Sequence, residues 1–374
     1  MLAITNSRFF KNNQLINNQT ILIADGKIIA FTDGVIPDGY EVIDAEQDYL
    51  VPGFMELQIY GSGGNLFSAY PTAETLAQMD EDLISKGTTS FLACVATNSS
   101  AIVHQAIEAA KAYRPMAKGF MGLHLEGPYL NAKRKGAHIA EFIKKATLEE
   151  VKALLEHADG VVKMMTIAPE LQDEEVIELL LAHNVVLSIG HSDASFEQAT
   201  EAYNKGITTT THLFNAMPSI HHRDPNLPTA FFNHSTAMAS IIADGSHVNF
   251  EVIKMSHKLA RGRLFFITDA VTACNIGPYQ HQLVGDKFIT PDGTLSGSNI
   301  TLVDAVRNAV EYCDIDLHDA LNMASSIPAK VIQKQTEFGK IEVGYAANLL
   351  ILDQSIKAKE IIFQGERVNS TFQH

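Results

Sequence analysis

The sequence predicts an α/β protein, a closed (β/α)8 barrel of the TIM type with a small β-domain built from both chain ends. Three observations predict this fold. Strand-like apolar runs alternate with helical patterns through the middle of the chain, whereas both ends carry strand patterns alone. The 374 residues, 46% of them hydrophobic, also suffice for one large barrel with an appendage.

Both chain ends have the pattern of β-structure. TILIADGKIIAF places Asp25-Gly26 between two apolar runs, which is a strong signal for a hairpin. Near the other end, ANLLILD and EIIFQGERV are strand patterns separated by a charged turn. We therefore expect residues 1–50 and 341–374 to pair into one domain around a barrel formed by residues 51–340.

The central segment alternates between two patterns. The strand patterns are FMELQIY, TSFLACVAT, FMGLHLEG, VVKMMTIAP, VVLSIGHS, TTTTHLF, MASIIADG and RLFFITDA. Between them lie the helical patterns AETLAQMDEDLISKG, AIVHQAIEAAKAY, TLEEVKALLEHA, DEEVIELLLAHN, SFEQATEAYNKG and NFEVIKMSHKLARG. Such alternation implies parallel strands, and eight units favour a closed barrel. An open doubly wound sheet is the alternative, but no glycine fingerprint for a dinucleotide follows any strand.

Composition narrows the class of protein. A net charge of −15 argues against a nucleic-acid surface, since little could neutralise the phosphates. No apolar run is long enough to span a bilayer, and MLAITNSRFF lacks the layout of a signal peptide. The three cysteines are scattered without metal-ligand spacing, which indicates structural thiols in a reducing compartment. We expect a cytoplasmic protein that binds neither nucleic acid nor membrane.

Polar residues stand where the predicted barrel strands end, and barrel enzymes place their chemistry there. Glu126 and His191 stand at the ends of apolar strands, His212 ends a strand of threonines, and Asp269 lies in the last barrel strand. One βα unit separates the two histidines, so we expect them on adjacent strands. A carboxylate and two imidazoles can hold a divalent metal, and Asp269 can act as general base.

Each of these residues also has a structural interpretation. Glu126 could pair with Lys133, His212 could be a hydrogen-bonded core histidine, and Asp269 could form a salt bridge to a loop arginine. We interpret His124, on the same strand as Glu126, as such an interior histidine. The joint occurrence of the acidic and imidazole residues at strand ends favours the metal site.

Several longer motifs add a resemblance to a known family. They are PGFMELQIYGSGG, GLHLEGPYLNAKRKGAH, GHSDAS, THLFNAMP, IADGSHV, TDAV, LSGSNITL and GKIEVGYAANLLILD. Through them the chain resembles the N-acetylglucosamine-6-phosphate deacetylase family of the amidohydrolase superfamily over nearly its whole length. The resemblance implies a barrel inserted in a β-sandwich, and an enzyme that hydrolyses the acetamide of an amino-sugar phosphate.

The resemblance also implies roles for individual residues. Glu126, His191 and His212 would hold the metal, Asp269 would be the catalytic acid/base, and His138 would lie near the amide carbonyl. The sugar and phosphate would contact Asn215, Ala216, Arg223 and His247, and the acetyl end would contact Leu295 and Ser296. Members of the family are typically homodimers in which the arginine matching Arg223 reaches the neighbouring site.

The first barrel strand departs from many amidohydrolases. They carry His-x-His at its end, which supplies two ligands for a second metal, whereas this chain has Gln58-Ile59-Tyr60. Neutral glutamine and tyrosine are poor ligands for a transition metal. We therefore expect one divalent ion per subunit, Zn²⁺ or Fe²⁺, with Gln58 hydrogen-bonded to its water. Tyr60 either blocks the second position or packs under the loop.

The implied reaction uses a metal-bound hydroxide as nucleophile and Asp269 as acid/base, and it releases glucosamine 6-phosphate and acetate. Two alternatives stay open. The enzyme could act on the N-acetylgalactosamine 6-phosphate epimer, because the motifs do not reveal one hydroxyl's orientation. The chain could also be a catalytically inactive sugar-phosphate-binding relative, although a binding protein has no need of Asp269.

Overall fold

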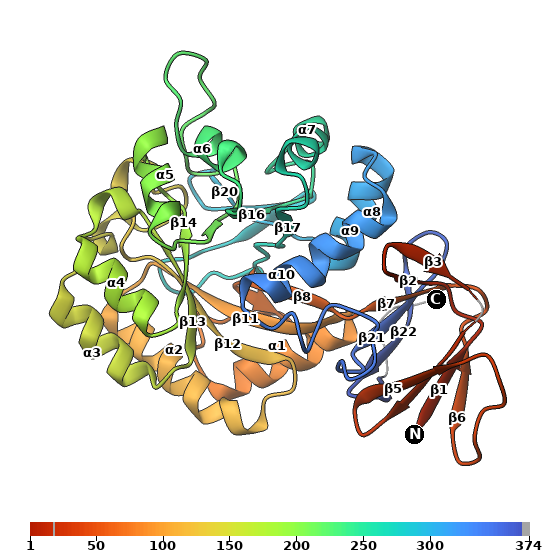
Figure 1. Ribbon diagram of the computed structural model, residues 1–374. Coiled ribbons are helices and arrows are strands. Elements are labelled where there is room, and N and C mark those ends of the chain that lie inside the picture. The colour runs from red at the N-terminus through yellow and green to blue at the C-terminus, as the bar shows by residue number, and fades with distance from the viewer. Residues whose placement is uncertain (18, 369–374) are drawn as a thin grey trace.

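A barrel with a β-sandwich at its side makes up this computed structural model, which describes residues 1–17 and 19–368 (Figure 1). An eight-stranded parallel sheet contains the barrel strands in chain order. They are β8 (Phe54–Ile59), β11 (Thr88–Ala96), β12 (Phe120–Glu126), β13 (Val162–Ile167), β14 (Val186–Ile189), β15 (Thr209–Thr210), β16 (Met238–Ile241) and β17 (Leu264–Phe266). All eight predicted strands are confirmed.

The barrel closes between its first and last strands. Just beyond β17, Ala270 forms a parallel bridge to Ile59 of β8. The amide of Asp269 donates to the carbonyl of Gln58 at 3.0 Å, and the amide of Tyr60 donates to the carbonyl of Ala270 at 2.9 Å. The closed barrel is therefore correct and the open sheet is not.

Helices follow most strands and cover the outside of the barrel (Figure 1). The six predicted helices are confirmed as α1 (Ala73–Ser85), α2 (Ser100–Tyr113), α3 (Leu148–Ala158), α4 (Glu174–Ala182), α5 (Phe196–Asn204) and α7 (Phe250–Ala260). The sequence analysis did not identify α6 (Leu227–Asn233), α8 (Leu302–Cys313), α9 (Leu317–Ala324) and α10 (Ser326–Val331). Side-chain caps fix several helix starts, as where Thr72 and Ser195 each accept the amide three residues on.

The two chain ends form the β-sandwich together. One sheet has the order β5-β4-β1-β6 and the other β23-β22-β21-β7. The strands are β1 (Leu2–Thr5), β4 (Thr20–Ala24), β5 (Lys27–Thr32), β6 (Glu41–Asp44), β7 (Tyr49–Pro52), β21 (Leu349–Leu352), β22 (Ala358–Phe363) and β23 (Glu366–Val368). The predicted hairpin is confirmed, with Asp25 at φ 50° and Gly26 at φ 72° in its turn.

Smaller strands complete the fold. They are β2 (Phe9–Lys11) with β3 (Gln14–Ile16), β9 (Gly61–Ser62) with β10 (Asn65–Leu66), and a sheet of β18 (Gln282–Val284), β19 (Lys287–Ile289) and β20 (Leu295–Gly297). The domain boundaries at 50/51 and 340/341 stay predictions. Since β7 pairs with β21, the two ends nevertheless share one sheet.

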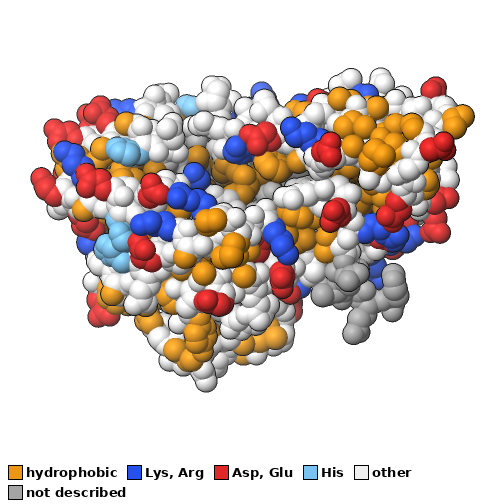
Figure 2. All heavy atoms as spheres, turned by 90° about the horizontal axis from the view of Figure 1, so that it is seen from below, with side chains coloured by type: hydrophobic (Ala, Val, Ile, Leu, Met, Phe, Trp, Pro, Cys, Tyr) orange, Lys and Arg blue, Asp and Glu red, His pale blue; other side chains and the backbone are white. Residues whose placement is uncertain are grey.

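Apolar clusters lie in both parts of the fold. Ile4, Ile23 and Ile351 pack in the sandwich, and Leu57, Met164 and Phe265 pack in a cluster of barrel-strand residues. On the face seen from below, acidic and basic side chains are interspersed with apolar ones (Figure 2). Within the described residues, no helix is both long and apolar enough to cross a membrane.

Candidate active site

The predicted site residues meet at the ends of the barrel strands. Glu126 is the last residue of β12, His191 and His212 each lie two residues beyond β14 and β15, and Asp269 lies three beyond β17. All four line one cavity, and the two histidines and Glu126 are at most 4% exposed. The convergence that the sequence predicted is therefore present.

The backbone is left-handed at three of these positions. The φ angles are 47° at His191, 33° at His212 and 54° at Asp269. Residues with side chains rarely adopt this region, and such conformations gather at functional sites. Each strand ends in a sharp turn at these residues, which directs the side chain toward the cavity rather than along the barrel wall.

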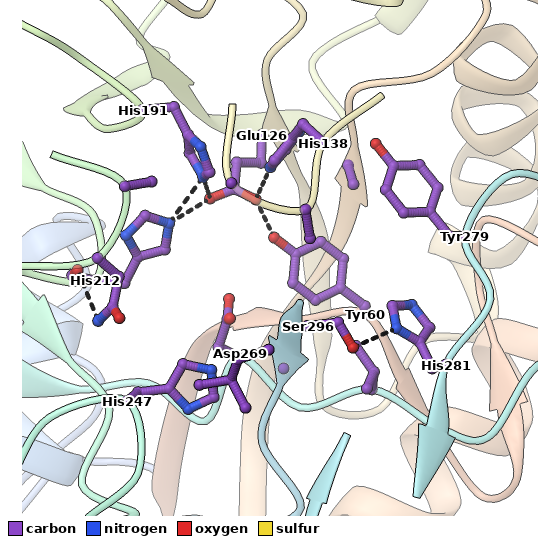
Figure 3. A pocket seen from close by; sticks show the side chains of 18 of the residues that line it. Tyr60, Glu126, His138, His191, His212, His247, Asp269, Tyr279, His281 and Ser296 are labelled. Carbon is purple, nitrogen blue, oxygen red and sulfur yellow. Dashed lines mark hydrogen bonds and ion pairs between the residues drawn. The ribbon is translucent and has the colours of Figure 1, made fainter. Parts of the chain in front are cut away.

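Three donor atoms lie within reach of one cation. Oε1 of Glu126 is 3.0 Å from Nε2 of His212 and 3.4 Å from Nε2 of His191, and the two nitrogens are 3.0 Å apart (Figure 3). Ligands of a tetrahedral zinc ion at about 2.1 Å are about 3.4 Å from one another. The spacing of this buried oxygen and nitrogen set therefore fits a divalent metal ion.

Neighbouring groups orient these donors. Nδ1 of His191 is 2.8 Å from the carbonyl of Arg134, so an N–H there donates to that carbonyl and leaves the Nε2 lone pair toward Glu126. On the other carboxylate oxygen, Oε2, His138 Nε2 lies at 2.9 Å and the Tyr60 hydroxyl also donates. Both oxygens of the carboxylate are thus held in place.

Gln58 links the carboxylates on either side of the cavity. Its Nε2 lies 2.7 Å from Oδ1 of Asp269, 3.0 Å from Oε1 of Glu126 and 3.1 Å from the Tyr60 hydroxyl. The polar face of β8 therefore faces the site and not solvent. The ring of Tyr60 packs in an apolar cluster that includes Cys94.

The surroundings of the two acids of the site, Glu126 and Asp269, shift their pKa values in opposite directions. Burial raises the pKa of Asp269, and the nearby charge of Glu126 raises it further. Burial also opposes ionisation of Glu126, but the adjacent His138 and His191 hold its pKa well below the ordinary value. Burial and the neighbouring His138 lower the pKa of His191 to about 4, which suits a neutral ligand. Glu126 is therefore charged, and Asp269 is poised to take up a proton.

The predicted substrate-binding residues divide into two groups. Asn215, Ala216, His247 and Leu295 line the same cavity as the metal group. Arg223 does not line it and lies in an exposed loop. The structure thus leaves the predicted arginine outside the cavity of its own chain.

Some residues of the site were not found from the sequence. Asp244 accepts from Nδ1 of His247 at 2.7 Å, and Tyr279 and His281 line the cavity. Glu56, also on the polar face of β8, accepts the amides of Gln58 and Thr268 at 2.8 Å each. Asp244 had a local signal, since it stands three residues before His247 in the motif IADGSHV, and Glu56 had one because it alternates with Gln58 and Tyr60 along the first barrel strand.

Comparison with known proteins agrees with this arrangement. Residues 49–372 match the model of the Amidohydrolase family. The chain belongs to the amidohydrolase family. The N-acetylglucosamine-6-phosphate deacetylases of Haemophilus influenzae and Danio rerio are each 31% identical to this amidohydrolase, over 97% of its length and over 98% and 95% of theirs.

Solved structures resemble the amidohydrolase closely. The N-acetylglucosamine-6-phosphate deacetylase of Pasteurella multocida superposes with a TM-score of 0.93 at 30% identity, covering 98% of this chain and 99% of that one. A Mycobacterium smegmatis deacetylase mutant in complex with N-acetyl-D-glucosamine-6-phosphate gives 0.89 at 27% identity, covering 98% of each chain. Family membership and the buried Glu126, His191 and His212 together indicate a divalent metal ion.

Proposed function

We propose that this amidohydrolase hydrolyses the acetamide of N-acetylglucosamine 6-phosphate to glucosamine 6-phosphate and acetate. The observation that carries the proposal is one cavity in which Glu126, His191 and His212 face one another and Asp269 lies beside them. The similarity to deacetylases over nearly the full chain supports the substrate.

In this proposal Glu126, His191 and His212 hold one divalent ion per subunit, zinc or iron, because mixed imidazole and carboxylate ligands suit these metals. When bound, the ion lowers the pKa of a water molecule toward neutrality and polarises the amide carbonyl. The chain's own residues supply the remaining steps.

Asp269 is the acid/base. Its carboxylate accepts a proton from the attacking water as that water's oxygen bonds to the acetamide carbon. Gln58 donates to Oδ1 of Asp269 at 2.7 Å and so holds the carboxylate in one orientation. The raised pKa allows Asp269 to keep this proton and then pass it to the sugar nitrogen as the carbon–nitrogen bond breaks. We assign His138 to the carbonyl oxygen, where a donor stabilises the developing negative charge.

Asn215, Ala216 and His247 are the proposed contacts to the sugar and phosphate. None of the described residues that line the cavity is a lysine or an arginine. Phosphate groups are commonly bound by cationic side chains, and arginine matches them with two parallel hydrogen bonds. We therefore propose a homodimer in which Arg223 of the partner subunit completes the phosphate site.

Acetate release tests the function. The purified protein is assayed with N-acetylglucosamine 6-phosphate, the unphosphorylated sugar and the N-acetylgalactosamine 6-phosphate epimer, together with metal content per chain. The expected result is about one metal per chain and fastest turnover of the first substrate. Faster turnover of the epimer would establish the alternative substrate, which the comparisons do not favour. Binding without turnover in a metal-loaded protein would indicate an inactive relative.

A further inference from the structure

Two of the three proposed metal ligands contact the loop that follows β12, residues 127–138 (the β12 loop). At one point of this loop, the carbonyl of Arg134 accepts from Nδ1 of His191 at 2.8 Å. At another, Nε2 of His138 lies 2.9 Å from Oε2 of Glu126 and reaches this carboxylate from the side away from His191 (Figure 3). Outer contacts of this kind orient metal ligands, so the position of the β12 loop determines how the two ligands are held.

An ion pair outside the cavity joins the β12 loop to the segment that carries His191. Nε and Nη2 of Arg134 donate to Oδ1 of Asp193 at 2.8 Å and 2.7 Å. Neither side chain lines the cavity, and their exposed fractions are 34% and 26%. The contacts form a closed ring. It runs from the guanidinium of Arg134 to Asp193, along the backbone to His191, and from the imidazole back to the carbonyl of Arg134.

A third segment supports the same region independently of this ion pair. Glu170, beyond β13, accepts from the Ser192 hydroxyl at 2.7 Å and from the amide of Asp193 at 2.8 Å. It also accepts from Nδ2 of Asn131 at 3.0 Å, and the amide of Asn131 donates to the carbonyl of His191 at 2.9 Å. None of these contacts uses the carboxylate of Asp193. Loss of the ion pair should therefore loosen the β12 loop without unfolding it.

We propose that Arg134 and Asp193 are positioning residues for the metal site, because their ion pair holds the β12 loop against His191 and so raises metal affinity. The inference depends on the ligand set proposed above, and neither residue is itself a ligand. Without the pair, the carbonyl of Arg134 is held less firmly, and His191 loses the fixed acceptor that orients its ring.

Zn²⁺ affinity is the measurement, by competition with a chelator of known affinity. Arg134→Met and Asp193→Asn should each weaken Zn²⁺ binding about five- to tenfold, since a charge-assisted pair that is partly shielded from water is lost. The double variant should bind Zn²⁺ as the weaker single variant does, because the two side chains form one contact. Fully additive losses would show instead that the two residues act separately.

Lys133 provides a matched control in the same loop. Its Nζ lies 3.5 Å from Oδ2 of Asp193, and its side chain is 79% exposed. Ion pairs as exposed as this one contribute little, because water and salt screen them. Lys133→Met removes the same charge from the same loop as Arg134→Met, and it should leave Zn²⁺ affinity nearly unchanged.

Salt distinguishes an ion pair from a general disturbance of the loop. At about 1 M salt the Debye length falls to about 3 Å, so a partly exposed pair is weakened. The difference in Zn²⁺ affinity between the wild type and Asp193→Asn should therefore shrink at high salt, whereas a difference caused by altered packing would persist. Wild-type affinity in both single variants, or a difference that salt does not change, overturns the inference. A wild-type protein that binds no Zn²⁺ refutes the proposed ligand set instead.

Discussion

Gln58 and Asp269 are joined twice across the junction of the first and last barrel strands. The backbone amide of Asp269 donates to the carbonyl of Gln58 at 3.0 Å, and Nε2 of Gln58 donates to Oδ1 of Asp269 at 2.7 Å. The residues are 211 positions apart in the sequence. Closure of the barrel thus places the proposed acid/base and fixes the direction of its carboxylate.

Replacing Gln58 with leucine should lower kcat by about 10- to 100-fold, because a hydrogen bond to a charged group contributes roughly 1.5–3 kcal/mol. At saturating metal KM should change little, since the sugar contacts remain, whereas metal affinity should fall as well, because Nε2 of Gln58 also lies 3.0 Å from Oε1 of Glu126. Steady-state kinetics with metal analysis measures this. An unchanged kcat would show that Asp269 keeps its orientation without the side chain of Gln58.

The variant Asp269→Asn should bind metal like the wild type and lose turnover by at least about 10²- to 10⁴-fold, the usual contribution of a general acid–base group. The amide keeps the size of the side chain but cannot take up the proton. Single-turnover acetate release and metal stoichiometry on the same sample separate these effects. Substantial remaining activity would rule out this role.

Tyr60→Phe should weaken metal binding by about 10- to 100-fold, because the phenol donates to Oε2 of Glu126 and helps to fix that carboxylate. Competition with a chelator of known affinity measures the change. Tyr113→Phe is the matched control, since this buried hydroxyl donates to Asp80 at 2.8 Å. Equal metal affinities in the two variants would show that the Tyr60 hydroxyl does not support the site.

Arg223→Ala should raise KM for the phosphorylated sugar at least about tenfold and leave the unphosphorylated sugar nearly unaffected, since a charge-assisted pair to phosphate is lost. If the arginine acts across a dimer, mixing this variant with Asp269→Asn should restore part of the activity. Each mixed dimer then contains one complete site. Loss of activity without restoration in exchanged dimers would argue against action in trans.

His124 gives a prediction about acid stability. Its ring contacts the Leu57 carbonyl at 2.9 Å and the Thr166 hydroxyl at 2.8 Å, and burial lowers its pKa to about 4. The unfolded chain protonates this histidine near pH 6.5, so the unfolded state binds more protons between pH 6.5 and 4. The stabilisation from a neutral His124 is present above pH 6.5 and is lost as the pH falls, by at most about 3 kcal/mol.

His124→Gln removes this titration and should flatten the pH dependence of the unfolding free energy over that interval. Denaturant titrations of wild type and variant from pH 7 to pH 4 measure the difference. His104, which lies exposed on α2, serves as the control position for the same substitution. Parallel pH profiles for His124→Gln and the wild type would contradict a neutral buried ring.

The barrel and the metal-binding group could be predicted because the alternation of strand and helix patterns and the spacing of the motifs can be read from the sequence. Glu126, His191 and His212 stand at the ends of predicted strands, and strand ends converge in any barrel. The left-handed turns at His191 and His212 have no comparable signal, and they explain why β15 is shorter than the pattern TTTTHLF indicates. His281 was missed because its contact with Ser296 joins the residue just before β18 to a residue of β20 15 positions further on, and local periodicity does not encode that contact.

The sequence also could not predict where Arg223 lies relative to the cavity. A motif can place an arginine in a loop, but only coordinates show that the loop leads away from the cavity of the same chain. The missed helices α8 to α10 follow a stretch without the regular strand–helix alternation on which the prediction depended.

The pairing of β7 with β21 has a consequence for how the chain is made. The N-terminal strands leave the ribosome hundreds of residues before their partner at Leu349–Leu352 exists. Because chains emerge N-terminus first, the backbone groups of β7 that pair with β21 have no such partner until Leu349–Leu352 has been synthesised. A chain truncated before Leu349 therefore lacks the strand that covers this edge of β7, and an uncovered edge is a template for pairing with other chains.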